Sequence, residues 1–174
     1  TAIVQGSPEI RLQTTRIAYL SQQPALLPWA SVINNVLLGF TLRGEDIAAE
    51  DVQRAKQLLK AVGLHMLSER QISQLSGGQQ ARVALARALV EDADLVLLDE
   101  PFSSLDRSTR IQMAQLCRQL LPAKTVILVT HDPRDAHHWL DRAMVLTKTT
   151  LKGPFSLSDF ESDDLLIQVL EDEQ

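Results

Sequence analysis

Apolar residues follow two different spacings along the chain, and these spacings separate strand-like from helical stretches. The first 20 residues contain short apolar runs around the turn sequence Gly6-Ser7-Pro8, which predicts short β-strands. From Ser31, a suitable cap residue, the spacing becomes helical through Phe40. A second helix is expected from about Glu45 to Val62, where Gly63 would end it. A β-rich beginning therefore leads into a helical region.

The second half of the chain has the alternating pattern of a parallel sheet. A helix is expected from Ser76-Gly77-Gly78 to Val90, followed by apolar, strand-length runs at 94–99 and 125–130. A helix over 106–121, capped by Asp106, would lie between them, and this β-α-β order is typical of parallel sheets. Beyond it we expect a short helix over 133–140, a strand over 143–148, and a last helix or frayed end in the acidic segment after Ser158.

Composition limits the classes of function. The length fits one α/β domain, and 17 basic residues scattered among 22 acidic ones argue against a nucleic-acid surface. Cys117 is the only cysteine, so an internal disulfide is impossible, and we expect a small buried side chain there. The apolar runs are too short to cross a bilayer. The first residues lack an initiator Met and a signal-peptide pattern, so the chain reads as one entered midway.

Two adjacent carboxylates follow the first of these buried strands. Residues 95–100 read Leu-Val-Leu-Leu-Asp-Glu, which places Asp99 and Glu100 at the carboxyl edge of the sheet, where α/β proteins bind ligands. One carboxylate can hold Mg²⁺, while the other can orient a water that attacks a γ-phosphate. The alternative is a strand that runs into an ordinary acidic turn.

A hydroxyl and two glycines open the helix that precedes this strand. In Leu75-Ser76-Gly77-Gly78-Gln79 the glycines leave backbone N–H groups accessible to an anion, because no Cβ stands in the way. A phosphate contact is therefore expected. The alternative is a simple helix cap beside a flexible turn.

Together these segments resemble the ABC ATPase family. The pentapeptide at 75–79 is similar to its signature motif, and residues 79–89 continue as the helix of that family does. In the family's order, Gln22 matches the Q-loop glutamine, residues 101–106 match the segment that ends in the D-loop, and His131 matches the H-loop histidine. Taken singly, Gln22 reads as a solvated strand end and His131 as a capping or buried histidine. The resemblance extends from about residue 3 to residue 148.

The resemblance implies a fold, a division of the chain and a set of roles. The fold would be α/β: a truncated P-loop NTPase-like parallel sheet core with a helical (signature) subdomain and an N-terminal β part. The single partial domain, 1–174, would divide into a β part ending in the Q-loop, the helical subdomain, the sheet core and an acidic segment, at 1–23, 24–90, 91–150 and 151–174. The implied ligands are ATP and Mg²⁺. The implied catalytic residues are Glu100, His131 and Gln22, the metal site is Asp99 with Gln22, and the contacts to ATP across a dimer come from Ser76, Gly77, Gly78, Gln79 and Asp106.

The family's phosphate loop, G-x-x-x-x-G-K-[ST], is not found. Only 21 residues precede Gln22, whereas a strand, loop and helix of that kind need about 30. Gly39 and Gly44 have the right separation, but the carboxylates of Glu45 and Asp46 follow and would repel phosphate. The chain alone is thus expected to bind ATP poorly. Two interpretations are favoured: a piece of a transport ATPase, or a partner without a P-loop that regulates or assembles with a complete subunit. The short single domain and acidic surface disfavour a third, a soluble ABC ATPase of translation or DNA repair.

A rigid apolar turn, Pro24-Ala25-Leu26-Leu27-Pro28-Trp29, follows Gln22. Its side chains would either fill the helical subdomain or contact a partner. The resemblance implies contact with transmembrane permease subunits of importers of the nitrate, sulfonate, taurine and pyrimidine-precursor group, at the cytoplasmic face of the cell membrane, with a second ATP-binding subunit completing a homodimer. No metal site is expected at Asp132, Asp135, His137 and His138, since neighbouring helical residues diverge by about 100°.

Overall fold

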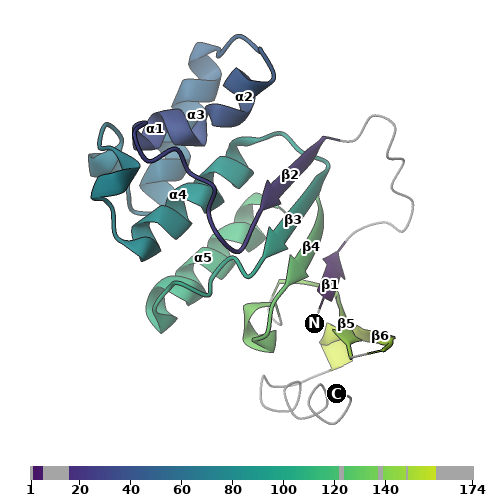
Figure 1. Ribbon diagram of the computed structural model, residues 1–174. Helices are drawn as coiled ribbons and strands as arrows, with labels where there is room; N and C mark the ends of the chain where they lie inside the picture. The colour runs from purple at the N-terminus through teal and green to yellow at the C-terminus, as the bar shows by residue number, and fades with distance from the viewer. Residues whose placement is uncertain (1, 6–15, 122–123, 137–138, 148, 160–174) are drawn as a thin grey trace.

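The computed structural model describes residues 2–5, 16–121, 124–136, 139–147 and 149–159. Its centre is a six-stranded sheet in the order β2-β3-β4-β1-β5-β6 (Figure 1). Strands β2, β3 and β4 are parallel, β1 is antiparallel to both β4 and β5, and β6 is antiparallel to β5. The strands are β1 Ala2–Gln5, β2 Ile17–Leu20, β3 Leu95–Asp99, β4 Thr125–Val129, β5 Arg142–Leu146 and β6 Leu151–Ser156.

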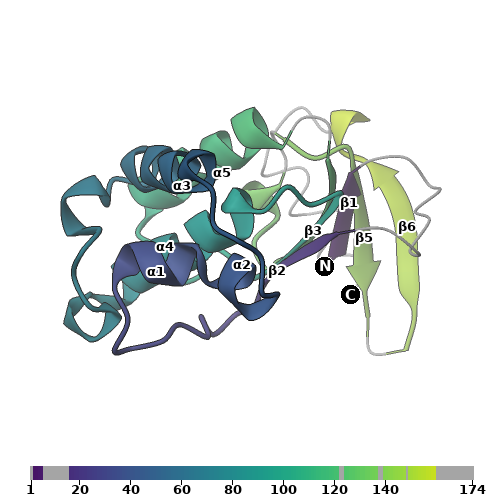
Figure 2. The ribbon, with the colours of Figure 1, turned by 90° about the horizontal axis from the view of Figure 1, so that it is seen from above.

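Helices α4 (Gly77–Val90) and α5 (Arg107–Leu120) lie on one face of this sheet (Figure 2). The strand residues that face them are buried and belong to one apolar core: Ala18, Leu20, Val96, Leu98, Val126 and Leu128. On the opposite face, where no helix of the described segments lies, Ile17, Tyr19 and Val129 are 52%, 57% and 39% exposed. The alternation of buried and exposed positions follows from the pleat of the strands.

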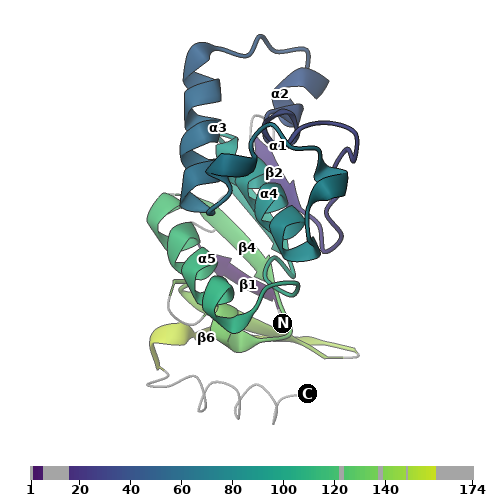
Figure 3. The same ribbon diagram turned by 90° about the vertical axis from the view of Figure 1, so that its left-hand side faces the viewer.

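A helical region packs on α4 and extends the core. It contains α1 (Val32–Val36), α2 (Leu38–Leu42) and α3 (Ala49–Ala61), which gather at one end of the molecule, away from β5 and β6 (Figure 3). Among the residues that the structure places, no helix is both long and apolar enough to cross a membrane.

Most of the predicted elements are confirmed. Ser31 caps α1, Asp106 caps α5, α4 ends at Val90, and β3 pairs with β4 in parallel. The predicted helix over 31–40 is two short helices that meet at Leu37. The helix expected from Glu45 begins only at Ala49, because Gly44 has a φ of +69° and Ala48 is extended.

The structure differs from the sequence-based expectation at two places near the end of the described chain. Of the helix expected over 133–140, the described residues form only a 3₁₀ turn, Pro133–Asp135, and residues 137 and 138 lie outside the description. The carbonyl of Asp135, which an α-helix would offer to the backbone N–H of Trp139, accepts instead from the indole N–H of that residue. Strand β6 was not expected at all. The turn at 6–8 and the end of the acidic segment, from residue 160, lie outside the described residues.

Candidate functional site

The two predicted carboxylates lie at the carboxyl end of β3, between the ends of β2 and β4. Asp99 is the last strand residue and is half-buried. Glu100 has a φ of +48°, in the left-handed region that side chains other than Gly, Asn and Asp rarely adopt. Its N–H donates to Val129 at 2.9 Å, and its carbonyl accepts from the Ser103 hydroxyl at 3.0 Å. These bonds hold a strained backbone that turns the Glu100 side chain toward β4.

The Glu100 carboxylate hydrogen-bonds to His131, the second residue after β4. One oxygen accepts the backbone N–H of His131 at 2.8 Å, and the other lies 2.8 Å from Nδ1 of its ring. The Glu100 side chain is 13% exposed, whereas that of His131 is 72% exposed. An ionised carboxylate only accepts hydrogen bonds, so Nδ1 must carry the hydrogen and Nε2 is the nitrogen available to a ligand. The interpretation of His131 as a buried histidine is excluded.

Buried polar residues behind His131 hold it in place. The hydroxyl of Thr130 donates to Asp135 at 2.8 Å, and Arg110 of α5 lies 2.7 Å from Asp132 and 3.7 Å from Asp135. Burial alone would raise the pKa of Asp132, but hydrogen bonds from Arg134 and the charges of Arg134 and Arg110 outweigh it, and the pKa is lowered. Burial raises the pKa of Asp135, which Thr130 and Arg110 only partly offset.

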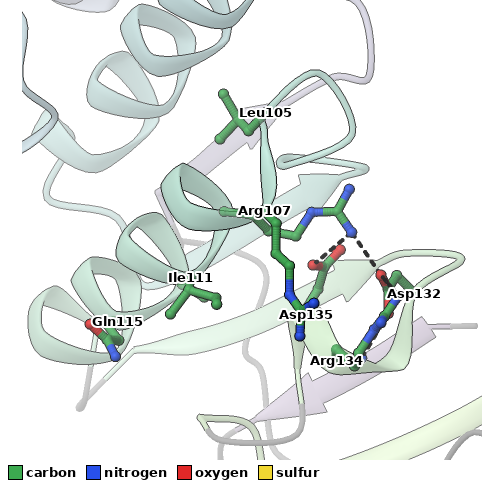
Figure 4. A pocket seen from close by; sticks show the side chains of 9 residues that line it. Leu105, Arg107, Ile111, Gln115, Asp132, Arg134 and Asp135 are labelled. Carbon is green, nitrogen blue, oxygen red and sulfur yellow. Dashed lines mark hydrogen bonds and ion pairs between the residues drawn. The ribbon is translucent and has the colours of Figure 1, made fainter.

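A pocket of about 540 Å³ opens beside this group, between α5 and the turn after β4 (Figure 4). Arg107, Arg134, Asp132 and Asp135 line it together with apolar side chains of α5. Its charged groups are largely occupied with one another, since Asp132 pairs with both Arg110 and Arg134. The pocket therefore belongs to the structure that positions His131.

Gln22 lies just beyond β2 and reaches the same edge. A cavity of about 10 Å³, room for roughly one water, is lined by Gln22, Glu100 and Ser103 and by Ala81 and Ala84 of α4. The structure thus brings Gln22 and Glu100 together, as the order of motifs predicts. Gln22 is exposed, in agreement with a position at a solvated strand end, and it lines the same small cavity as Glu100.

The glycine-rich segment forms the tip of α4. Ser76 caps the helix by accepting from Gln79 N at 3.3 Å, and the Gln79 side chain accepts from Ser76 N at 2.9 Å. A Cβ at Gly78 would touch Ser104 and Leu105, but at Gly77 it would meet nothing within 4 Å. The interpretation of Ser76 as a simple helix cap is correct. It does not explain Gly77, which has ordinary helical backbone and open space before it.

The Asp106 side chain caps the N-terminus of α5. Its two carboxylate oxygens accept from the hydroxyls of Ser108 and Thr109 at 2.7 and 2.6 Å and from both backbone N–H groups at 3.0 Å. These bonds, led by that of Thr109, hold the pKa of Asp106 far below its usual range. Asp106 is exposed beside the Ser104–Leu105 segment that touches Gly78.

The donor set fits magnesium better than a metal held by protein alone. The described segments contain no group of three or more His, Cys, Asp or Glu residues arranged to hold an ion. Mg²⁺ commonly takes one or two carboxylates and completes its shell with water and substrate phosphates. Asp99 at the end of β3 can supply one such carboxylate, and Gln22 follows the neighbouring parallel strand β2. The pair His137 and His138 lies outside the described residues.

The turn after Gln22 divides its side chains between core and surface. Leu26 packs against the core, whereas Trp29 is 70% exposed. The sequence left open whether these side chains fill the helical subdomain or contact a partner. Leu26 lies against the core, and for the exposed Trp29 the partner contact stays a prediction. The sequence analysis did not identify Thr130 and Arg110, which bond to the buried aspartates behind His131. It also did not identify Asn35 and Arg87, which hydrogen-bond to the backbone of this turn. The only available signal was a polar run, Thr130-His131-Asp132, directly after an apolar strand.

Comparisons with known proteins agree with this geometry. The chain is 47% identical over 131 residues to an uncharacterized ABC transporter ATP-binding protein of Haemophilus influenzae, covering 75% of this chain and 54% of that protein. It is 44% identical over 135 residues to the aliphatic sulfonates import ATP-binding protein SsuB 1 of Mesorhizobium japonicum, covering 76% and 50%. The chain thus spans about half the length of these curated relatives.

A solved structure gives the same assignment. The post-hydrolysis dimer of the ATP-binding cassette MJ0796 bound to ADP and Pi superimposes with a TM-score of 0.73 at 32% identity, covering 82% of this chain and 63% of that one. The family described as "ABC transporter" matches residues 2–103. By sequence, by fold and by the order of its motifs, the chain belongs to the ABC transporter family.

Proposed function

We propose that this chain is part of an ATP-binding and ATP-hydrolysing subunit of an ABC importer, which couples nucleotide-driven dimerisation to solute uptake. The observation that carries the proposal is the Glu100–His131 pair. A nearly buried carboxylate on a strained backbone contacts His131 twice at the carboxyl edge of the sheet, at 2.8 Å from its backbone N–H and at 2.8 Å from Nδ1 of its exposed imidazole. Strain of this kind persists where the surrounding structure maintains it, and it clusters at active sites.

Each residue at the edge would take one part of the reaction. Asp99, with Gln22, would hold Mg²⁺, which when bound neutralises charge on the β- and γ-phosphates. Glu100 would orient and polarise the attacking water, with Gln22 on the other side of the small cavity that both residues line. His131 would place Nε2 against the γ-phosphate, because Nδ1 is engaged by Glu100.

The tip of α4 would serve a second nucleotide. Gly77 has open space in front of it, and the Ser76 hydroxyl, which accepts from Gln79, keeps its own hydrogen to donate. We infer that Ser76, Gly77, Gly78 and Gln79 contact the triphosphate bound by a partner subunit, with Asp106 at the same seam. The dimeric cassette that superimposes on this chain supports the inference.

The names of the relatives support a proposal about the class of transported solute and the membrane partner. Several relatives carry names of sulfonate importers and one that of a thiamine importer. We propose that this chain serves an importer of small organic solutes, at the inner face of the cell membrane, with Trp29 facing permease subunits. Exposed aromatic side chains are common at the centres of interfaces.

Nucleotide affinity of this chain by itself is a separate proposal. No glycine of the sequence is followed by lysine, so the lysine and backbone cradle of a P-loop are not contributed by these 174 residues. We propose that the chain alone binds ATP weakly. The second candidate is a P-loop-less partner that assembles with a complete subunit.

The decisive experiment measures ATP turnover by the intact subunit with its permease. Glu100→Gln should lower turnover by roughly 10²- to 10⁴-fold while ATP binding is retained, because the variant keeps the shape of the side chain but loses the base. Glu50→Gln, an exposed change on α3, is the matched control. Unchanged turnover in Glu100→Gln would remove Glu100 from the role of base. Turnover that appears only when the chain is mixed with a complete subunit would favour the second candidate.

A further inference from the structure

The segment from Pro24 to Ser31, here called the Pro24–Ser31 turn, is anchored by Asn35 of α1. The Asn35 side chain is fully buried. Its oxygen accepts from Leu27 N at 2.7 Å, and its nitrogen donates to Leu27 O at 3.1 Å and to Ser31 O at 3.0 Å. A buried amide satisfied at both ends fixes the backbone that it binds, since losing any of these bonds would leave a polar group unpaired.

A second anchor comes from α4. The Arg87 guanidinium donates to the carbonyl of Ala25 at 2.6 Å, across 62 positions of sequence. Arg87 is half-buried, and burial lowers its pKa without removing its charge. A hydrogen bond from a charged donor is about twice as strong as one between neutral groups. Arg87 therefore binds the turn to the same helix whose first residues form the Ser76–Gln79 tip.

Backbone hydrogen bonds also join the Pro24–Ser31 turn to the segment that precedes α4. Ser73 N donates to Pro28 O at 3.1 Å and Ile72 N donates to Ala30 O at 3.2 Å, so both neighbours of Trp29 are bound. The 3₁₀ turn Ile72–Gln74 leads directly to Ser76, and Gln80 of α4 donates to Ile72 O at 3.3 Å. The exposed Trp29 side chain is thus carried by a backbone that is bonded to both ends of α4.

We infer that Asn35 and Arg87 are positioning residues that join the Pro24–Ser31 turn to α4, so that any displacement of the Ser76–Gln79 tip moves the Trp29 surface with it. An α-helix transmits such a displacement well, because backbone hydrogen bonds join every turn of the roughly 15 Å between Gly77 and Arg87. A turn without these anchors would absorb the motion locally. This inference rests on the proposed function, and it names the residues through which the nucleotide site and the partner surface are coupled.

The turn itself can be tested in the chain as it stands. Arg87→Met keeps the apolar stem and removes the donor, while Ala25 O, at the surface, can turn to water. Backbone amides of residues 24–31 should exchange hydrogen about tenfold faster or more in this variant, and Arg87→Lys should restore part of the protection. The control is Arg54→Met, which removes a guanidinium that donates to Leu89 O of α4 at 3.5 Å. Equal exchange in all three variants would overturn the inference.

The coupling can be tested in the intact subunit with its permease. Arg87→Met should leave permease-independent ATP turnover within about twofold of wild type, and reduce its stimulation by the permease about tenfold. A general loss of stability would lower both rates together, and that result would overturn the inference. If the wild-type subunit shows no ATP turnover, the proposed function fails, and the exchange measurement alone then decides whether Arg87 anchors the turn.

Discussion

Glu100 offers a stability measurement that tests the site without any nucleotide. Glu100→Ala and Glu100→Gly both remove the carboxylate and its two contacts with His131, so these losses cancel when the two variants are compared. What differs is the backbone at φ +48°. Glycine relieves about 1–2 kcal/mol of left-handed strain but loses roughly 0.5–1 kcal/mol more backbone entropy on folding. The glycine variant should therefore be more stable by about 0.5–1 kcal/mol, whereas alanine is normally the more stable of the two.

Urea unfolding followed by circular dichroism measures this difference. With a slope near 2 kcal/mol/M, the midpoint of Glu100→Gly should lie roughly 0.3–0.5 M above that of Glu100→Ala. Gly44→Ala is the matched control, because Gly44 has a φ of +69° and an added Cβ would meet nothing within 4 Å, so backbone strain alone should cost about 1 kcal/mol. A midpoint for Glu100→Ala equal to or above that for Glu100→Gly would refute the left-handed conformation of Glu100.

Three further predictions concern residues around the site. The substitution Phe102→Ala should lower the free energy of unfolding by about 3–5 kcal/mol, because the Phe102 side chain is fully buried. A loss as small as that of Ile111→Ala, at a half-exposed position, would contradict the place of Phe102 in the core. Burial raises the pKa of Cys117 to about 12, so iodoacetamide should alkylate it at about pH 8 only after unfolding; rapid reaction of the folded chain would count against its burial. Because the pKa of Asp106 is lowered in the folded state, its contribution to stability is present above the unfolded value of about 3.9 and is lost as pH falls through the folded value. The difference in melting temperature between wild type and Asp106→Asn should thus be constant above about pH 5 and shrink in stronger acid, and a difference independent of pH would contradict this.

Sequence reasoning worked best where local chemistry decides the structure. Ser31 and Asp106 were predicted as caps because their side chains can accept from N–H groups two or three residues ahead, and both do so. Ser76, for which a cap was only the alternative to a phosphate contact, caps its helix as well. The strands β3 and β4 were recognisable as continuous apolar runs, a pattern that is typical of parallel strands. The helix expected over 133–140 begins as a 3₁₀ turn, because the carbonyl of Asp135 accepts from the indole N–H of Trp139 in a buried region and not from its backbone N–H.

The sequence by itself determined the order of the motifs, the parallel β-α-β unit and the residues at its carboxyl edge, since these depend on periodicity, caps and short spacings along the chain. Only the tertiary structure decided that Glu100 has a left-handed backbone and grips His131, that Thr130 and Arg110 support that histidine, and that Arg87 holds the carbonyl of Ala25. The physical reason is distance along the chain. These contacts join residues 5 to 62 positions apart, and no local preference for helix, strand or turn specifies which buried donor meets which acceptor.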